Sequence, residues 1–331
     1  MKEQFDVSVY YAQPKSDSKG LSGKELDSPD GVQVFHSLGR TVAKVNGFDL
    51  VIIGGWGRFD HRIITIVCKA ARVRCAVFSD QTSSVSRPPF TFILRKHFVR
   101  LHDFFFIAGE TAAENFAREF GLPSARVFTF PYAHNDRLRK IDEDNEIPSK
   151  CSRSADVKVF VANRFIPRKG YGTLYNALRI LQDHRIAGSL SFSIAGTGPE
   201  LEFWRSKFSS LRLRLNFVGW VSEEIYDELL TDCDIYIHAS DFEPYGIPVV
   251  DATMRLKRVI STTGVYSALD LKRAGVPIRM ITPGDFQALA DHLVSAANEK
   301  ELPQTLVNSD AVQKRIFPIA NLKTLQSVLE K

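Results

Sequence analysis

Short apolar runs alternate with amphipathic stretches along most of the 331-residue chain. A short apolar run bounded by turn-forming residues is typical of a buried strand, and apolar residues spaced three and four apart are typical of a helix packed on one side. The first part of the chain predicts strands at residues 6–11, 49–53, 74–78, 103–108 and 126–130, and helices at 61–72, 90–101 and 111–120. This alternation predicts an α/β domain with a parallel sheet covered on both faces.

A polar stretch at residues 142–156 reads as a linker, and the alternation restarts after it. The second part predicts strands at 157–162, 190–195, 215–218, 234–238 and 258–261, and helices at 170–184, 200–208, 223–230 and 248–256. The chain is therefore predicted to hold two domains, at residues 1–150 and 151–305, followed by a helical tail at 306–331.

The most informative segment follows the strand predicted at 234–238. It places Glu243 in a turn, breaks the apolar pattern with a glycine and two prolines, and places Asp251 eight positions further along a helix. A helix N-terminus offers free N–H groups and a positive dipole end, so it suits a phosphate. The segment predicts that Glu243 stands beside a bound phosphate and that Asp251 faces the same cleft.

Two more predicted strands end in residues that suit such a ligand. The strand at 157–162 runs into Arg164 and then Lys169, and the strand at 190–195 runs into a turn with Gly196 and Gly198. That turn lacks the third glycine of a dinucleotide-binding fingerprint. Because parallel-sheet domains bind ligands beyond the carboxyl ends of their strands, we expect these segments to form one site.

Together these segments resemble the retaining GT-B glycosyltransferases of the "group 1" type (family 4), whose Glu-x7-Glu signature Glu243 and Asp251 match. The resemblance covers the second domain strongly and the first in outline. It implies the GT-B fold, with two Rossmann-like domains that face a cleft. It also implies that Glu243 contacts the donor sugar and that Asp251, one methylene shorter than the usual Glu, contacts the ribose.

The resemblance further implies that Arg164 and Lys169 hold the donor diphosphate. A departing nucleoside diphosphate develops negative charge, and fixed cations stabilise that charge if no metal is used. No Asp-x-Asp motif lies at a strand end, so the site is predicted to be metal-independent, with the nucleotide sugar as co-substrate and no cofactor. The remaining donor-binding residues implied are Tyr245, Gly246, Ile247, Gly196, Gly198, Val218 and Gly219.

The first domain matches this family less fully. Its opening residues look like the second strand of the family, so the first β-α unit, with its glycine-rich loop, is expected to be absent. On the acceptor side, Trp56 stands between glycines with Arg58 close behind, and a Trp there can stack on a sugar or pack in the core. Asp80 follows the next strand and can bind an acceptor hydroxyl or cap a helix.

Composition narrows the class of protein. Hydrophobic residues make up 44% of the chain and charged residues 24%, and the net charge of +5 is too small to indicate nucleic-acid binding. Four cysteines without a C-x-x-C pair indicate a reducing compartment and no structural zinc. The sequence shows no signal peptide and no membrane-length apolar run, so we expect a cytoplasmic protein.

The helix predicted at 90–101 carries an apolar stripe, with Arg95, Lys96 and Arg100 away from it. A basic amphipathic helix can lie on anionic lipid, and a helix packed in the core with a solvated charged face has the same pattern. The first alternative predicts a weak peripheral contact with the inner face of a membrane.

The sequence therefore predicts a retaining, hexosyltransferase-like enzyme. It would move a sugar from a nucleotide diphosphate donor to a glycan or lipid-linked acceptor, in bacterial-type surface polysaccharide or glycolipid assembly. Two alternatives stay open: a non-catalytic GT-B remnant that binds nucleotides or glycans, and a nucleotide-sugar epimerase.

Overall fold

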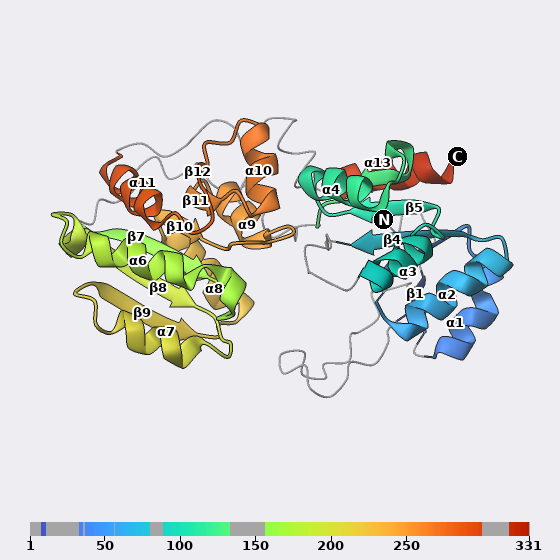
Figure 1. The fold of residues 1–331 in the computed structure, drawn as a ribbon, viewed down its shortest axis with the longest axis horizontal. Helices are drawn as coiled ribbons and strands as arrows, with labels where there is room; N and C mark the ends of the chain where they lie inside the picture. The colour runs from blue at the N-terminus through green and yellow to red at the C-terminus, as the bar shows by residue number, and fades with distance from the viewer. Residues whose placement is uncertain are drawn as a thin grey trace.

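The computed structural model describes residues 8–10, 33–35, 37–55, 57–79, 89–132, 156–299 and 318–330. These residues form two α/β halves that lie side by side (Figure 1). The N-terminal half comprises the described residues between 8 and 132 together with the last helix, and the C-terminal half comprises residues 156–299.

The C-terminal half is built on one parallel sheet, with strand order β12-β11-β10-β7-β8-β9. Its strands are β7 (Val157–Ala162), β8 (Leu190–Ala195), β9 (Arg214–Gly219), β10 (Ile235–His238), β11 (Arg258–Thr262) and β12 (Arg279–Ile281). One face is covered by α6 (Tyr171–Leu181), α7 (Leu201–Phe208) and α11 (Phe286–Asn298). The other face is covered by α8 (Glu223–Asp232), α9 (Ile247–Met254) and α10 (Tyr266–Arg273).

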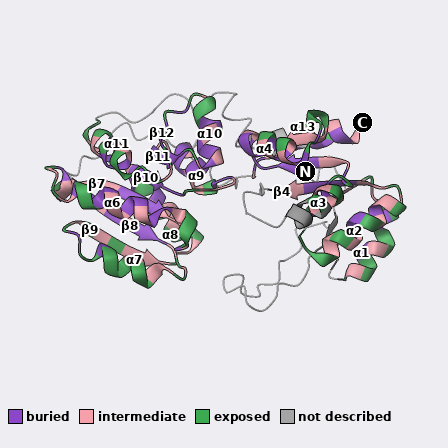
Figure 2. Cartoon of the chain, viewed as in Figure 1, coloured by how far each residue is buried: buried purple, intermediate pink, exposed green. Residues whose placement is uncertain are grey.

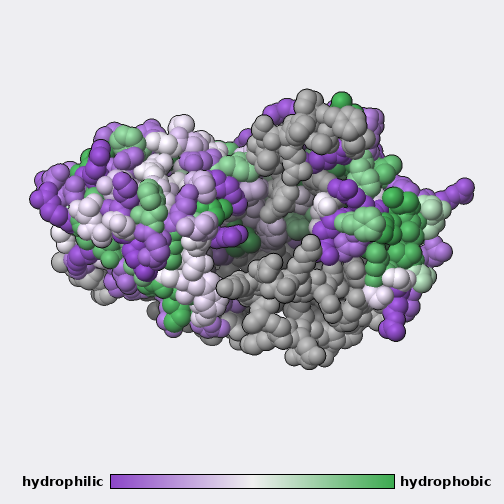
Figure 3. All heavy atoms as spheres, turned by 60° about the horizontal axis from the view of Figure 1, so that its bottom comes forward, coloured by the Kyte–Doolittle hydropathy of each residue, from purple (hydrophilic) through white to green (hydrophobic). Residues whose placement is uncertain are grey.

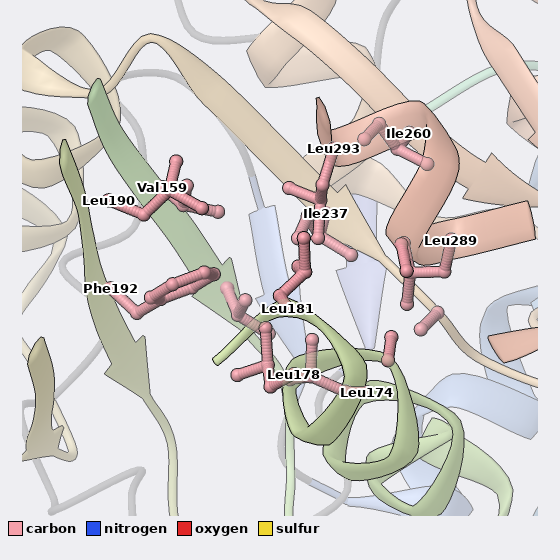
Figure 4. Close-up of a cluster of buried hydrophobic side chains, with 14 of the residues drawn as sticks. Val159, Leu174, Leu178, Leu181, Leu190, Phe192, Ile237, Ile260, Leu289 and Leu293 are labelled. Atoms are coloured by element: carbon pink, nitrogen blue, oxygen red, sulfur yellow. The ribbon is translucent and has the colours of Figure 1, made fainter. Parts of the chain in front are cut away.

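Burial on both faces explains why these strands read as continuous apolar runs. Along β7, Val159 and Val161 face α6 and α11, whereas Phe160 between them faces the opposite helices. Figure 4 shows Val159 and Phe192 of the sheet gathered with the leucines of α6 and α11. Across the molecule, the buried residues lie in the sheets and on the helix faces that cover them (Figure 2).

The N-terminal half contains two separate parallel sheets among its described strands. The larger, in the order β3-β4-β5-β6, comprises β3 (Leu50–Gly54), β4 (Arg74–Ser79), β5 (Phe104–Ile107) and β6 (Val127–Thr129). The smaller pairs β1 (Ser8–Tyr10) with β2 (Gln33–Phe35). The helices are α1 (Leu38–Lys44), α2 (Phe59–Ala70), α3 (Pro89–Val99) and α4 (Glu110–Phe120).

The last helix, α13 (Pro318–Leu329), returns to the N-terminal half. Its Leu325 and Val328 pack on Phe106 of β5. Arg74 donates hydrogen bonds to the last two carbonyl oxygens of the helix, both at 3.1 Å, which satisfies acceptors that a helix end leaves open. The helix predicted in the tail is therefore part of the N-terminal half, although the predicted boundary at residue 305 lies outside the described residues.

Most predicted strands and helices are confirmed, with shifts of one or two residues at most of their ends. The elements that the pattern did not predict are β2, α1, α10, β12 and α11. The strand predicted at 6–11 is β1, and it pairs with β2 rather than with the larger sheet. Apart from Asp156, the predicted linker lies outside the described residues. Short 3-10 helices complete the described fold at Val45–Gly47, Ser124–Arg126, Pro167–Lys169 and Ala187–Ser189.

Candidate active site

The turn that carries Glu243 is braced between two strand ends. It follows β10, which is buried at every position, and precedes α9. The N–H of Glu243 donates to Gly264 O at 2.9 Å, and Glu243 O accepts from the N–H of Tyr266 at 3.1 Å. A Cβ on Gly264 would lie 2.0 Å from Asp241 O, so only glycine permits this approach of the two loops. The Glu243 backbone is thereby fixed at the carboxyl ends of β10 and β11.

Two cations from the loop after β7 hold the Glu243 carboxylate. Lys169 Nζ donates a hydrogen bond to Glu243 Oε2, and the side chains of the pair are only 9% and 16% exposed. Arg168 donates to Phe242 O at 2.7 Å and lies 3.3 Å from Glu243 Oε2. The sequence predicted Lys169 at this site but missed Arg168, because one arginine in a basic loop carries no pattern of its own.

The electrostatics of this cluster keep Glu243 ionised. Burial raises the pKa of Glu243, but the Lys169 ammonium group bound to its carboxylate acts against burial, and the pKa is lowered to about 2. Burial lowers the pKa of Lys169, and the facing carboxylate partly offsets that effect. Because the pKa of Glu243 is lowered, its ionised form stabilises the fold above pH 4.5, and this contribution is lost as the pH falls towards 2.

A buried histidine lies beneath the carboxylate. His238 is 1% exposed, and its Nε2 stands 4.0 Å from Glu243 Oε2, beyond hydrogen-bond distance. Its Nδ1 lies 3.2 Å from the hydroxyl of Tyr236. Burial lowers the pKa of His238, which favours the neutral imidazole beside the ion pair.

The glycine turn after β8 supports the loop that carries Arg164. A Cβ on Gly196 would lie 1.8 Å from Asn163 O, and a Cβ on Gly198 would lie 2.4 Å from Phe165 O. The N–H of Phe165 also donates to Thr197 O at 2.9 Å. Arg164 itself is exposed at the end of β7, close enough for its charge to act on Lys169. The turn therefore positions the cationic loop by direct backbone contact.

Asp251 lies on α9, half-buried, and is held by a neighbouring helix. The hydroxyl of Tyr226 on α8 donates to Asp251 Oδ2 at 3.1 Å. Burial and the nearby carboxylate raise the pKa of Tyr226, so its hydroxyl stays a donor. Tyr226 lies within an ordinary amphipathic helix, which is why the sequence did not indicate it.

A comparison with known protein families identifies the family to which the chain belongs. The model of the family "Glycosyl transferases group 1" matches residues 142–311, about half of the chain. The chain belongs to the group 1 glycosyltransferases.

Curated relatives of this group 1 glycosyltransferase match over shorter stretches. An uncharacterized glycosyltransferase, YqgM of Bacillus subtilis, is 25% identical over 189 residues, which is 56% of this chain and 50% of the relative. The GPI3 subunit of phosphatidylinositol N-acetylglucosaminyltransferase from Saccharomyces cerevisiae is 29% identical over 118 residues, 34% of this chain and 25% of the subunit. This chain thus spans half or less of the length of these curated relatives.

Solved structures show the GT-B fold. Alr3699/HepE of Anabaena in complex with UDP aligns with a TM-score of 0.71 and 18% identity, over 90% of this chain and 86% of that one. Sucrose-phosphate synthase of Thermosynechococcus elongatus aligns with a TM-score of 0.68 and 14% identity, over 99% and 89%. The predicted fold class is confirmed, whereas the predicted absence of the opening β-α unit remains a prediction.

The other predicted donor-binding residues occupy the same ends of the sheet. Gly246, in a left-handed conformation with φ 98°, starts α9, and Ile247 follows it, partly exposed. Val218 and Gly219 end β9, where Gly219 O accepts from the N–H of Gly196 at 2.7 Å. Tyr245 is buried, and its ring packs on that of Tyr132 of the N-terminal half at 5.2 Å between centroids.

The two halves meet beside that ring pair. Figure 3 shows the molecule hollowed between the halves. Beside the rings of Tyr132 and Tyr245, a cavity of ≈ 30 Å³ is lined by Glu110 and Pro131 of the N-terminal half and by Tyr245 and Asp270 of the C-terminal half. The ring contact of Tyr245 therefore joins the donor-side turn, which carries Glu243 and Tyr245, to the N-terminal half.

The predicted acceptor-side residues are only partly described. Arg58 forms a two-pronged ion pair with Asp60 at 3.0 and 2.9 Å, at the start of α2. Trp56 and Asp80 lie outside the described residues. His61, which the sequence reading did not single out, holds the same loop through Nδ1, 3.0 Å from Gly55 O.

The basic residues of α3 turn towards a neighbouring helix. Arg100 donates to Phe120 O and Gly121 O, both at 3.2 Å, and Arg95 lies over the Phe120 ring. Lys96 Nζ also lies beside Gly121, so all three basic residues gather at the C-terminus of α4, where cations are favourable. None of the described helices combines the length and apolar character that a membrane span requires.

The described residues also bear on the predictions for metal binding and for the cysteines. There, no three His, Cys, Asp or Glu side chains gather as a metal site would require. Cys68, Cys75 and Cys233 are free and buried, as expected of small apolar residues. Cys151 lies outside the described residues.

Proposed function

We propose that this protein is a retaining, hexosyltransferase-like enzyme that moves a sugar from a nucleoside diphosphate donor to an acceptor hydroxyl without a divalent metal. The observation that carries the proposal is the Glu243 carboxylate, held ionised by Lys169 where β7 and β10 end. Retention follows the family resemblance.

In the proposed reaction the bond between the anomeric carbon and the diphosphate oxygen breaks. A bond from that carbon to the acceptor oxygen forms, and the hydroxyl proton passes to the leaving diphosphate. Arg164, exposed at the end of β7, and Lys169 stabilise the departing charge. Glu243 orients the sugar ring, and Asp251 binds the ribose.

The pairing of Lys169 with Glu243 gives the proposal a specific geometry. Lys169 is nearly buried, so its ammonium group is held in place rather than free to follow the substrate. A fixed cation costs little reorganisation when charge develops, which favours the transition state over the ground state. The same ammonium group then serves the sugar-facing carboxylate and the departing phosphate.

The solved Anabaena structures contain UDP or UDP-glucose, which supports a uridine nucleotide as the first donor to test. The acceptor is proposed to be a glycan or lipid-linked hydroxyl in surface polysaccharide or glycolipid assembly, as the family resemblance implies. A cytoplasmic location with weak peripheral membrane contact also stays a prediction.

The test combines nucleotide binding with product analysis. UDP, GDP and ADP are compared by thermal shift, and a ligand at about 100 times its Kd should add about 2.7 kcal/mol of stability. The bound nucleotide is then supplied as its hexose conjugate with glycan acceptors, with and without EDTA, and the anomeric configuration of the product is read by NMR. We expect transfer with retention that EDTA does not reduce.

Each other result overturns a definite part of the proposal. Loss of transfer in EDTA, restored by magnesium or manganese, contradicts the metal-free site. Nucleotide binding without transfer favours the non-catalytic remnant. A changed sugar released from donor alone favours the epimerase.

A further inference from the structure

A carboxylate from the C-terminal half caps a helix of the N-terminal half. Asp270 of α10 is 4% exposed, and its Oδ2 accepts from the N–H of Glu110 at 2.8 Å. Its Oδ1 accepts from the N–H of Thr111 at 2.9 Å and from the Thr111 hydroxyl. These two amides belong to the first turn of α4, where helical N–H groups have no partner within the helix.

The helix cannot supply this cap from its own N-cap position. That position is Gly109, which has no side chain and a φ of 98°. A Cβ there would lie 2.8 Å from Asp270 Oδ2, so glycine leaves room for the incoming carboxylate. The N-terminus of α4 is thus completed by a residue 160 positions further along the chain.

The buried Asp270 carboxylate depends on the hydrogen-bond donors of α4. Burial raises the pKa of Asp270, and the hydrogen bonds from Thr111 and Glu110 act against that rise. An ion pair between α10 and α4 joins Arg273 to Glu114 at 3.3 Å, with both side chains about half exposed. Such an exposed pair contributes little. Asp270 is therefore the principal polar link between these helices.

The same helix is tied to the turn that carries Glu243. The N–H of Tyr266 donates to Glu243 O at 3.1 Å, and the N–H of Ser267 donates to Tyr245 O at 2.9 Å. The Ser267 hydroxyl donates to Gly246 O at 3.0 Å. All three bonds come from the first turn of α10, one turn before Asp270, so displacement of α10 displaces the backbone of the donor-side turn.

We propose that Asp270 is a positioning residue for the transfer reaction. By binding the N-terminus of α4, it sets α10 against the N-terminal half and so fixes Glu243 relative to the acceptor side. Asp270 touches neither the donor nor the reacting atoms. The catalytic part of this proposal rests on the proposed function, whereas the mechanical link between α4, α10 and Glu243 does not.

The experiment compares Asp270→Ala and Asp270→Asn with Lys272→Ala. Lys272 lies exposed on the same helix, so its replacement controls for a change in α10 that leaves the link intact. Hydrogen exchange by mass spectrometry follows peptides containing the amides of Glu243, Tyr266 and Ser267. Transfer kinetics and UDP binding are measured on the same full-length preparations.

With Asp270→Ala, we expect faster exchange at these amides as well as at the start of α4. Since a misplacement of about 1 Å can cost about 10²-fold in rate, kcat should fall about 10- to 100-fold. The Kd for UDP should change less than kcat, because UDP lacks the sugar that Glu243 is proposed to contact. Asp270→Asn keeps an acceptor for Thr111 and should fall between the wild type and Asp270→Ala. Lys272→Ala should match the wild type.

Unchanged exchange at Glu243, Tyr266 and Ser267 in Asp270→Ala overturns the proposal, as does a kcat equal to that of Lys272→Ala. If Asp270→Ala does not fold, Thr111→Val on the other half decides the matter, because it removes one hydrogen bond and keeps the side-chain shape. Unchanged exchange in Thr111→Val then overturns the link. A wild-type protein that binds UDP without transfer overturns the proposed function and the catalytic role of Asp270, and the exchange data still decide whether the link exists.

Discussion

The two halves of this glycosyltransferase differ in how they hold the loops that follow their strands. In the C-terminal half, one six-stranded sheet places loops against one another through glycine contacts, as Gly196 does with Asn163 and Gly264 with Asp241. In the N-terminal half, the larger described sheet has four strands, and the loop after β3 is held by side chains such as His61. The half proposed to bind the donor is thus held together by backbone contacts between its loops.

This difference explains where sequence reasoning succeeds. A backbone contact that only glycine permits requires a glycine, which can be recognised in the sequence. Charged residues at fixed distances from strand ends can be recognised in the same way. Side chains that hold a loop, such as His61, follow no sequence pattern that would identify them. The C-terminal half could therefore be interpreted residue by residue, while the N-terminal half could be interpreted only in outline.

The largest expected effect tests whether the halves unfold as separate units. Phe192 of β8 and Phe106 of β5 are both buried, one in each half. Replacing either by Ala should cost about 3–5 kcal/mol, because the lost contacts leave a cavity. We expect Phe106→Ala to lower only the N-terminal transition in urea, with UDP binding retained, and Phe192→Ala to lower the C-terminal transition, with each transition followed by hydrogen exchange in peptides of that half. A single transition lowered equally by both variants contradicts independent halves.

The next effect sharpens the assignment of Glu243. Glu243→Gln removes the charge but keeps the shape, and loss of such an electrostatic contact should reduce kcat about 10²- to 10³-fold. It also leaves Lys169 nearly buried beside a neutral amide, so the C-terminal transition should fall by about 1–3 kcal/mol. The exposed Glu223→Gln on α8 is the control and should match the wild type in both respects. Near wild-type turnover in Glu243→Gln would remove it from the catalytic site.

The structure shows why some site residues were predictable and others were not. Lys169 and Glu243 follow predicted strands at positions that parallel topology brings together, and they do meet. Arg168 reaches Glu243, and Tyr226 reaches Asp251, through side-chain direction, which depends on packing that the sequence pattern does not encode. Asp270 is harder still, because its partners are backbone N–H groups of a helix that the sequence places in the other domain.

The unpredicted elements have a related cause. α10 begins immediately after the glycine-containing turn at the end of β11, and its first turn is fixed by bonds to the Glu243 loop. Most helical stability in proteins comes from such tertiary contacts rather than from local preference. The pairing of β1 with β2 is likewise set by topology, since a three-residue strand carries too little pattern to identify its neighbour.

A smaller effect tests the glycine contacts that hold the loops of the C-terminal half together. Gly196→Ala places a Cβ 1.8 Å from Asn163 O at a φ of 134°, so the Arg164 loop must move. Backbone strain of this kind costs about 1–3 kcal/mol, and the clash adds to it. Gly188→Ala is the matched control, because its Cβ would meet nothing within 4 Å. Urea denaturation and UDP titration should separate the two variants, and equal stability would show that the loop contact is dispensable.

The smallest expected effect concerns Asp251, the residue proposed to bind the ribose. Tyr226 holds Asp251, which is one methylene shorter than the usual family residue, in its place on α9. Tyr226→Phe removes one hydrogen bond, worth about 1 kcal/mol, so the donor KM should rise about 3- to 10-fold. The kcat should hardly change, because a ribose contact is remote from the bond that breaks. Tyr175→Phe on the opposite face of the sheet is the control, and Asp251→Ala should raise the donor KM further than Tyr226→Phe. If neither Tyr226→Phe nor Asp251→Ala alters the donor KM, Asp251 belongs to the packing between α8 and α9 and not to the donor site.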